Sequence, residues 1–169
     1  SIYNSKSDAL DLDFSNGNIK KLKCKNIGND CLDTSESKIK VDFIEGTNVL
    51  DKVISAGENS NLKIINAKIE NSGIGLVSKD GSYLDVQNVI LKEKIDLLGA
   101  NFIKKVEYDF AKLKISKIIS EKSELTILVD EKSQNDLPVE VNKRILSSKV
   151  IEKLMYGAVY GVKTIKWFI

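Results

Sequence analysis

The stretch Ser7-Asp8-Ala9-Leu10-Asp11 is followed 22 residues later by Asn29-Asp30-Cys31-Leu32-Asp33, a segment of nearly the same pattern. Self-similarity at a fixed step of this size is the sequence signature of a repeat architecture. The leucine of the pattern heads a column of aliphatic residues at the same step: Leu10, Leu32, Ile54, Leu76 and Leu98. We therefore expect a repeat of about 22 residues.

Further columns of small or apolar residues keep steps of 22 or 23. They are Leu12, Thr34, Ala56, Ser78 and Ala100; Ile19, Val41, Ile64, Val86 and Tyr108; Leu22, Ile44, Ala67, Val89 and Ala111; and Cys24, Gly46, Ile69, Leu91 and Leu113. One residue enters between Ile54 and Ile64 and is lost again before Leu76. These columns predict that equivalent residues of successive repeats lie above one another.

Within each repeat the side chains alternate between apolar and polar, as in Ile39-Lys40-Val41-Asp42-Phe43, which is the period of a β-strand. Turn formers such as Ser15-Asn16-Gly17 and Lys79-Asp80-Gly81-Ser82 separate these strands. A repeat without a crossover helix buries its apolar side chains only by coiling and stacking on the next repeat. The sequence predicts an all-β fold, a parallel β-helix of about five coils over residues 1–113.

Residues 114–169 lose the register and predict a small mixed α/β cap that belongs to the same domain. The expected elements are strands at 125–129 and 139–141 and a helix over 149–156. Ser147-Ser148 would cap the helix, whose apolar face would hold Val150, Ile151 and Leu154, and Gly157 would end it. Trp167 and Phe168 are expected to plug the coil end.

The composition excludes several classes of function. The 169 residues carry 26 basic and 24 acidic side chains, a net charge of +2, and Arg144 is the single arginine, so we expect no nucleic-acid partner. Histidine is absent, which removes the usual general base and the commonest zinc ligand. No apolar run is long enough to span a membrane. For the cysteines we expect a core thiol at Cys24 and a semi-exposed thiol at Cys31, with a bridge as the minor alternative.

The segment from Ser7 to Gly17, followed by Asn26-Ile27-Gly28-Asn29-Asp30, resembles right-handed parallel β-helix repeats of large bacterial surface proteins, some of which carry a spore-coat-kinase-like or other carbohydrate-linked module. The resemblance covers about residues 4–113 and extends to the superfold of pectate lyases and polygalacturonases. It implies a module of a larger surface or secreted protein, outside the cytoplasm. The chain also starts inside the pattern, so a neighbouring domain or another chain is expected to cover the N-terminal coil end.

The family's enzymes are matched only in part. Asn29-Asp30-Cys31 is similar to the paired-aspartate stretch of polygalacturonases, but the Gly-His-Gly and Arg-x-Lys motifs of that family are missing. Pectate lyases of this fold pair calcium-binding aspartates with an arginine, and Arg144 lies outside the coils. Both departures weigh against an enzyme.

The residues with the greatest capacity for catalysis or metal binding form an acidic cluster. Asp33 follows Asp11 by 22 residues and Asp30 follows Asp8 by 22, so each pair should stand about one strand spacing apart, with Asp11 and Asp13 pointing outward. Three accounts of the repulsion stay open. They are compensation by solvent and Lys52; a calcium ion that bridges Asp8, Asp11, Asp30 and Asp33; and a catalytic pair in which Asp11 and Asp33 are the acid and its ionised partner in glycan cleavage.

Two more features bear on binding. Asn26, Asn48 and Asn71 form a polar column whose side chains should hydrogen-bond along the stack, and Tyr83 should be exposed and able to stack on a sugar. The leading hypothesis is a non-catalytic scaffold or polysaccharide-recognition module in which Asp8, Asp13, Asp30 and Tyr83 contact the ligand. The alternatives are a polysaccharide lyase or hydrolase, with calcium as the expected cofactor if one is used, and an assembly role for the open coil ends.

Overall fold

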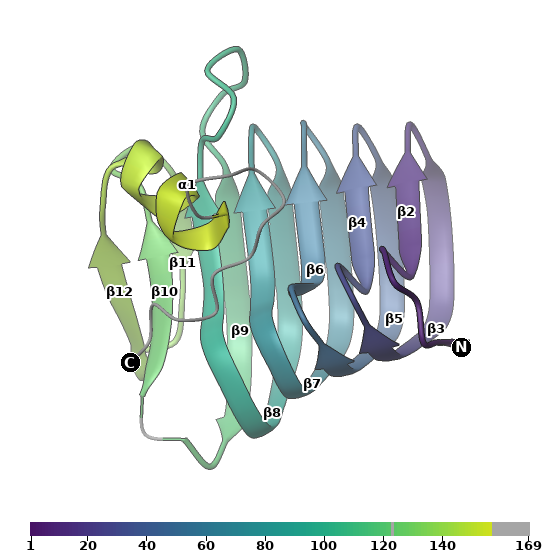
Figure 1. Cartoon of the computed structure of the whole chain (residues 1–169). Helices are drawn as coiled ribbons and strands as arrows, with labels where there is room; N and C mark the ends of the chain where they lie inside the picture. Colours follow the sequence, from purple (N-terminus) through teal and green to yellow (C-terminus); the bar gives the residue numbers. More distant parts are fainter. Residues whose placement is uncertain (123, 157–169) are drawn as a thin grey trace.

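The chain is a parallel β-solenoid of about six turns that ends in one short helix (Figure 1). The computed structural model describes residues 1–122 and 124–156. In the first coils a short strand is followed along the chain by a long one. After the short β1 (Ile2–Tyr3) come β2 (Leu10–Asp13), β3 (Asn16–Ile27), β4 (Leu32–Ser35), β5 (Lys38–Val49) and β6 (Lys52–Gly57). This confirms the predicted fold class.

The later strands run farther before they turn, and then give way to the cap. They are β7 (Asn61–Lys79), β8 (Tyr83–Phe102), β9 (Lys112–Ser120), β10 (Leu125–Val129), β11 (Gln134–Asp136) and β12 (Val141–Ile145), followed by α1 (Ser148–Tyr156). Parallel pairing continues past residue 113, because β10 pairs with β8 and β12 pairs with β10. The strand expected at 139–141 therefore lies slightly later, as β12.

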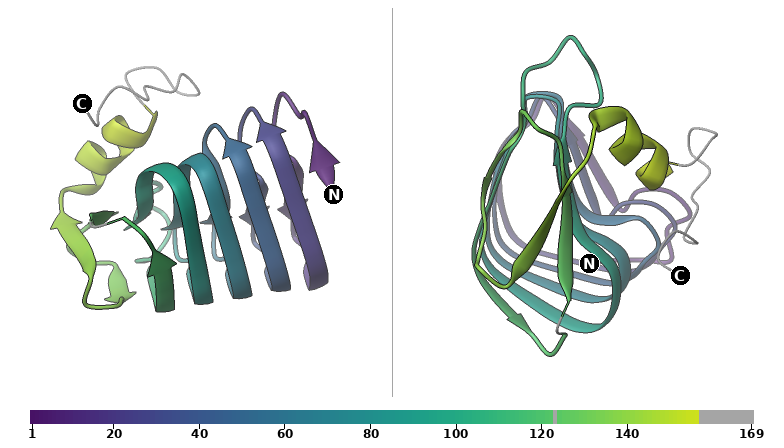
Figure 2. Two further views of the ribbon diagram at one scale, coloured as in Figure 1. Left: turned by 90° about the horizontal axis from the view of Figure 1, so that it is seen from below. Right: turned by 90° about the vertical axis from the view of Figure 1, so that its left-hand side faces the viewer.

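Seen along its axis, the stack is a closed coil with two main sides (Figure 2). On one side the short strands β2, β4 and β6 pair in sequence and join the C-terminal ends of β7 and β8. We call the outward surface of these strands the short-strand face. The long strands β3 and β5, with the first halves of β7 and β8, make the other side.

The core consists of stacked apolar rows in the predicted register. Leu10 pairs with Leu32, Leu32 with Ile54, and Ile54 with Leu76. Val41, Ile64 and Val86 stack in the same way and are fully buried. Each such side chain contributes roughly 1.5–3 kcal/mol by leaving water, and only the stacking of coils buries it. The extra residue predicted in the third coil is present, since Lys38 pairs with Asn61 while Lys52 pairs with Ile74.

The predicted columns are wrong at their last members. Leu76 pairs with Gly99 rather than Leu98, because the register shifts by one residue between Glu70 and Ser72. Val86 pairs with Ile115, not Tyr108. The fourth and fifth columns likewise end at Ile118 and Ser120, not at Ala111 and Leu113. For the third, fourth and fifth columns the physical reason is an inserted loop, residues 103–111, which leaves the sheet after β8 and projects from the stack (Figure 1).

The predicted asparagine column is confirmed and gains Asn4 as its first member. Asn26 Nδ2 donates to Asn4 Oδ1 at 2.9 Å, Asn48 to Asn26 at 2.9 Å, and Asn71 to Asn48 at 2.8 Å. All four residues have positive φ, between 44° and 58°. Asparagine suits this corner because its short polar side chain tolerates the left-handed conformation. The column thus serves backbone geometry and side-chain bonding together.

The cysteine prediction is wrong. Cys24 and Cys31 form a disulfide with a Cα–Cα distance of 5.7 Å, and both are buried. Cys24 lies near the C-terminal end of the long strand β3, and Cys31 immediately precedes the short strand β4 of the next coil. The corner between them folds the chain back, which brings two residues seven apart into bridging distance. Neither sulfur is a free thiol.

The predicted C-terminal helix is confirmed as α1. Ser147 caps it, because its Oγ accepts a hydrogen bond from Val150 N at 3.4 Å. Ile151 and Met155 are buried against Ile74, Val77 and Phe102 of the short-strand face, whereas Val150 is 44% exposed, contrary to prediction. Gly157, Trp167 and Phe168 lie outside the described residues.

Candidate functional site

The outermost predicted carboxylates do stand side by side on the short-strand face. Asp11 pairs with Asp33, and Asp13 with Ser35, in the β2–β4 register. Asp11 and Asp13 are exposed, as predicted, while Asp33 is half-buried. Partial burial, together with the charges of Asp13, Asp33 and Asp8, raises the pKa of Asp11 above its usual range. This pair is the solvent-facing acidic part of the site.

Asp8 and Asp30 have a different role, because their carboxylates bind backbone. Asp8 Oδ1 accepts from Asp30 N at 2.8 Å and from Asn29 Nδ2 at 2.5 Å. Asp30 Oδ1 in turn accepts from Lys52 N at 3.0 Å. Each aspartate thus fixes the corner of the following coil. Asp8 and Asp30 are occupied by these bonds and do not share one open cluster with Asp11 and Asp33.

Asp30 is buried in an ionic group with Lys52, the lysine that the sequence analysis named as a possible compensating charge. Lys52 Nζ lies 3.0 Å from Asp30 Oδ1 and also pairs with Asp51. All three residues are at most 5% exposed. Burial raises the pKa of Asp30 to about 7, although Lys52 opposes the shift. Burial would lower the pKa of Lys52, but Asp30, Tyr156 and Asp51 raise it above its usual range, so the lysine stays charged between Asp30 and Asp51.

The short-strand face changes character toward the helix. Beyond Asp33 the same row continues with Ser55 and then Val77, and beyond Ser35 the next row continues with Gly57 and Lys79. Ser55 is fully buried and Lys79 is 8% exposed. Tyr156, at the end of α1, lies with its ring 5.4 Å from Lys52 Nζ and 4.5 Å from Lys104 Nζ. The C-terminal end of α1 therefore bounds the part of the short-strand face that holds Ser55 and Lys79.

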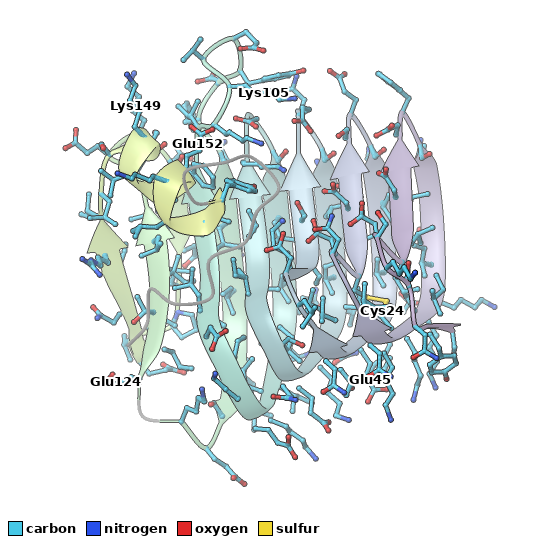
Figure 3. The ribbon with its side chains drawn as sticks, in the orientation of Figure 1. Cys24, Glu45, Lys105, Glu124, Lys149 and Glu152 are labelled. Atoms are coloured by element: carbon cyan, nitrogen blue, oxygen red, sulfur yellow. A yellow bond between two sulfur atoms is a disulfide. The ribbon has the colours of Figure 1, made fainter. Side chains whose placement is uncertain are left out.

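The inserted loop 103–111 bounds the face at the ends of its strands (Figure 3). Lys105 Nζ reaches back to Glu58 Oε1 at 2.6 Å, and Ser35 Oγ donates to the other oxygen of Glu58 at 2.7 Å. Asp80 holds the base of the loop by accepting from Lys104 N and Lys105 N at 2.6 and 2.7 Å. Sequence reasoning missed this loop, since its residues continued the predicted columns.

Tyr83 does not stand free as predicted. It begins β8, pairs in register with Asn61 and Lys112, and is half-buried. A ring flanked by strands on both sides offers less surface to a sugar than the prediction required.

A separate groove of about 620 Å³ runs beside the asparagine column. Its walls carry Asn4, Asn26, Asn48, Lys6 and Leu50. Leu50 is 56% exposed, which is unusual for a leucine in a coil whose other aliphatic side chains are mostly buried. Each asparagine in the middle of the column uses one N–H and one carbonyl lone pair within it, so a second N–H donor remains at each step.

Within residues 1–122 and 124–156, no group of three acidic or cysteine side chains converges as a metal ion would require. The four aspartates expected to bridge calcium are divided between backbone contacts, the Lys52 ion pair and the exposed face. In the same part of the chain, no helix has the length and apolar character needed to cross a membrane.

Comparison with protein-family models, with curated proteins and with solved structures finds no match to this chain.

Proposed function

We propose that this chain is a rigid, non-catalytic module that recognises polysaccharide as part of a larger bacterial surface or secreted protein. The groove beside the asparagine column carries the proposal. It offers amide donors repeated at the strand spacing of about 4.8 Å, one exposed apolar side chain in Leu50, and one cation in Lys6. A chain of sugar rings presents hydroxyls and apolar faces at regular intervals, and such a groove matches both.

Two other features support the proposal. The long-strand side carries an ion-pair series in which Glu45 lies 2.7 Å from Lys23 and 2.5 Å from Lys68, and Lys68 lies 3.2 Å from Glu70. Such a surface suits a scaffold that holds its shape and resists lateral sheet association. The buried disulfide suits an oxidising compartment outside the cytoplasm, as does the resemblance to repeats of bacterial surface proteins.

The test is binding of the full chain to a panel of soluble polysaccharides by affinity electrophoresis and calorimetry, with calcium and with a chelator. We expect Leu50→Glu to lower the affinity for the glycan about tenfold. Val139→Glu is the matched control, because Val139 is fully exposed and lies away from the groove. The proposal fails if no glycan binds, or if both variants weaken binding equally.

The raised pKa of Asp11 favours a second candidate, glycan cleavage at the Asp11–Asp33 pair. Glycan cleavage of this kind uses two neighbouring carboxyl groups, one of which has a raised pKa and serves as the general acid. The double variant Asp11→Asn, Asp33→Asn should then abolish turnover of an acidic glycan and leave its binding intact. Absence of turnover in the natural chain, with and without calcium, would remove this candidate.

A further inference from the structure

Two buried polar groups on the short-strand face lack the partners that burial normally demands. Within the described part of the chain, Ser55 Oγ makes no hydrogen bond. Across residues 1–122 and 124–156, the ammonium group of Lys79 has neither an ion-pair nor a hydrogen-bond partner. A buried hydroxyl without a partner costs about 1–3 kcal/mol, and a buried, unpaired charge costs several.

Lys52, whose side chain is also buried, shows how a buried ammonium group is normally stabilised. It has two carboxylates within ion-pair distance, Asp30 and Asp51. Lys79 has charges nearby but none in contact. Burial would lower the pKa of Lys79, yet Tyr156, Asp33 and Glu58 raise it above its usual range, so the group keeps its proton. A buried positive charge without a counterion is costly, and the approach of an anion would lower that cost.

Gly57 makes room for this lysine. A Cβ atom at position 57 would stand 2.8 Å from Lys79 Cε and 3.5 Å from Lys79 Nζ, so the lysine side chain lies directly over the bare strand β6. Ser55 lies two residues earlier on the same strand and pairs with Asp33. The ammonium, the free hydroxyl and the Asp33 carboxylate therefore surround one patch of β6.

The nearest carboxylates, those of Glu58 and Asp33, do not form an ion pair with Lys79. Glu58 is bound by Lys105 at 2.6 Å and by Ser35 Oγ at 2.7 Å. Asp33 accepts from Thr34 N at 3.1 Å and faces Asp11 across the register. Asp33 is thus placed to accept a hydrogen bond from a hydroxyl that lies between it and Lys79.

We propose that these residues, the Lys79 patch (Asp33, Ser55, Gly57 and Lys79), bind the carboxylate of a small hydroxy acid of the sugar-acid class. The carboxylate pairs with Lys79, one ligand hydroxyl donates to Asp33, and another oxygen bonds Ser55. A single negative charge balances the single lysine. A phosphate dianion would bring excess charge toward Asp33 and Asp11, and it offers fewer donors to the aspartate. The Lys79 patch lies on a different face from the asparagine groove, so this inference does not rest on the function proposed above.

The test titrates the full chain with sodium glucuronate by calorimetry and follows the melting temperature, with glucose, sodium phosphate and glycine as comparators. We expect glucuronate alone to bind and to raise the melting temperature. Lys79→Met and Ser55→Ala should each lower the affinity for glucuronate at least about tenfold. Lys63→Met, an exposed lysine of the same coil on the other side, should leave binding unchanged.

Stability gives a second readout that a structural lysine would not match. Lys79→Met removes an unpaired buried charge, so the free variant should melt no lower than the natural chain. The inference is overturned if glucuronate does not bind, if phosphate or glycine binds as well, or if Lys79→Met retains binding. It is also overturned if Lys79→Met unfolds the chain while Ser55→Ala leaves glucuronate affinity intact. Glycan binding in the asparagine groove should survive Lys79→Met, which separates the two proposals.

Discussion

Lys52 Nζ lies 3.0 Å from Asp30 Oδ1, one coil apart, and neither side chain is more than 4% exposed. The same lysine also pairs with Asp51. One cation therefore holds two coil corners together, and the backbone N–H of Lys52 bonds the same aspartate.

Removing that lysine should be strongly destabilising. Lys52→Met leaves Asp30 and Asp51 buried without a cation, and breaking a buried pair by removing one partner costs about 3–5 kcal/mol. Lys40→Met is the control, since the Lys40–Asp42 pair is about half exposed and such pairs contribute about 0–1 kcal/mol. Urea unfolding measures both. Equal effects of the two variants would contradict the role given to Lys52.

The pH dependence of stability should carry the signature of Asp30. Its pKa is about 7 in the folded chain against an ordinary value of 3.8, so between those values the folded state holds a proton that the unfolded state has released. The free energy of unfolding must then decrease as pH rises from about 4 to 7. Asp30→Asn keeps the acceptor for Lys52 N but cannot titrate.

The measurement is urea unfolding at several pH values for both proteins. The difference between the natural chain and Asp30→Asn isolates Asp30, because lowered pKa values at Glu45, Glu58 and Asp130 act equally in both. A difference that is flat between pH 4 and 7 would refute the prediction.

Reduction of the Cys24–Cys31 disulfide should lower the free energy of unfolding by about 2–3 kcal/mol, the amount expected for closing a short loop. Thiol titration of the unreduced, denatured chain should find no free thiol, since the described cysteines are both bridged. Cys24→Ala, Cys31→Ala is the control and should not respond to reductant. A natural chain that is equally insensitive would show that the bridge contributes nothing.

Gly99 should tolerate no side chain. A Cβ atom there would stand 2.1 Å from the carbonyl oxygen of Leu76, its partner in register. Gly99→Ala must push two stacked strands apart, and overpacking of this kind costs at least about 1–3 kcal/mol. At Gly17 nothing lies within 4 Å of the same atom. Gly17→Ala should therefore be neutral, and thermal unfolding of the two variants decides the comparison.

The sequence predicted the stack because its step is kept where apolar residues must meet. Leu10, Leu32, Ile54 and Leu76 are vertical neighbours, as their spacing required. Periodicity failed beyond Leu91 because the step from Tyr83 to its partner Lys112 is longer than the repeat. Spacing alone does not distinguish a residue that leaves the sheet from one that stays, and Tyr108 continued the pattern by chance.

The corners were harder to predict than the rows. Ser37 Oγ accepts from Ser15 N at 2.9 Å, Ser60 Oγ from Ser37 N at 3.2 Å, and Ser82 Oγ from Ser60 N at 3.1 Å. This serine column keeps the repeat step and was visible in the sequence as a signal. The Lys79 patch and the disulfide were not visible, because both depend on how corners and side chains cross between coils.

A stack held together between neighbouring turns opens as a zipper does, from its rims inward. The bridge of Cys24 to Cys31, drawn in yellow in Figure 3, joins the first full turns at the N-terminal end of the stack. In an oxidising medium that rim is locked, and peeling must start at the opposite, helix-bearing rim. Once the bridge is reduced, the same rim becomes the place where a protease first finds unpaired backbone.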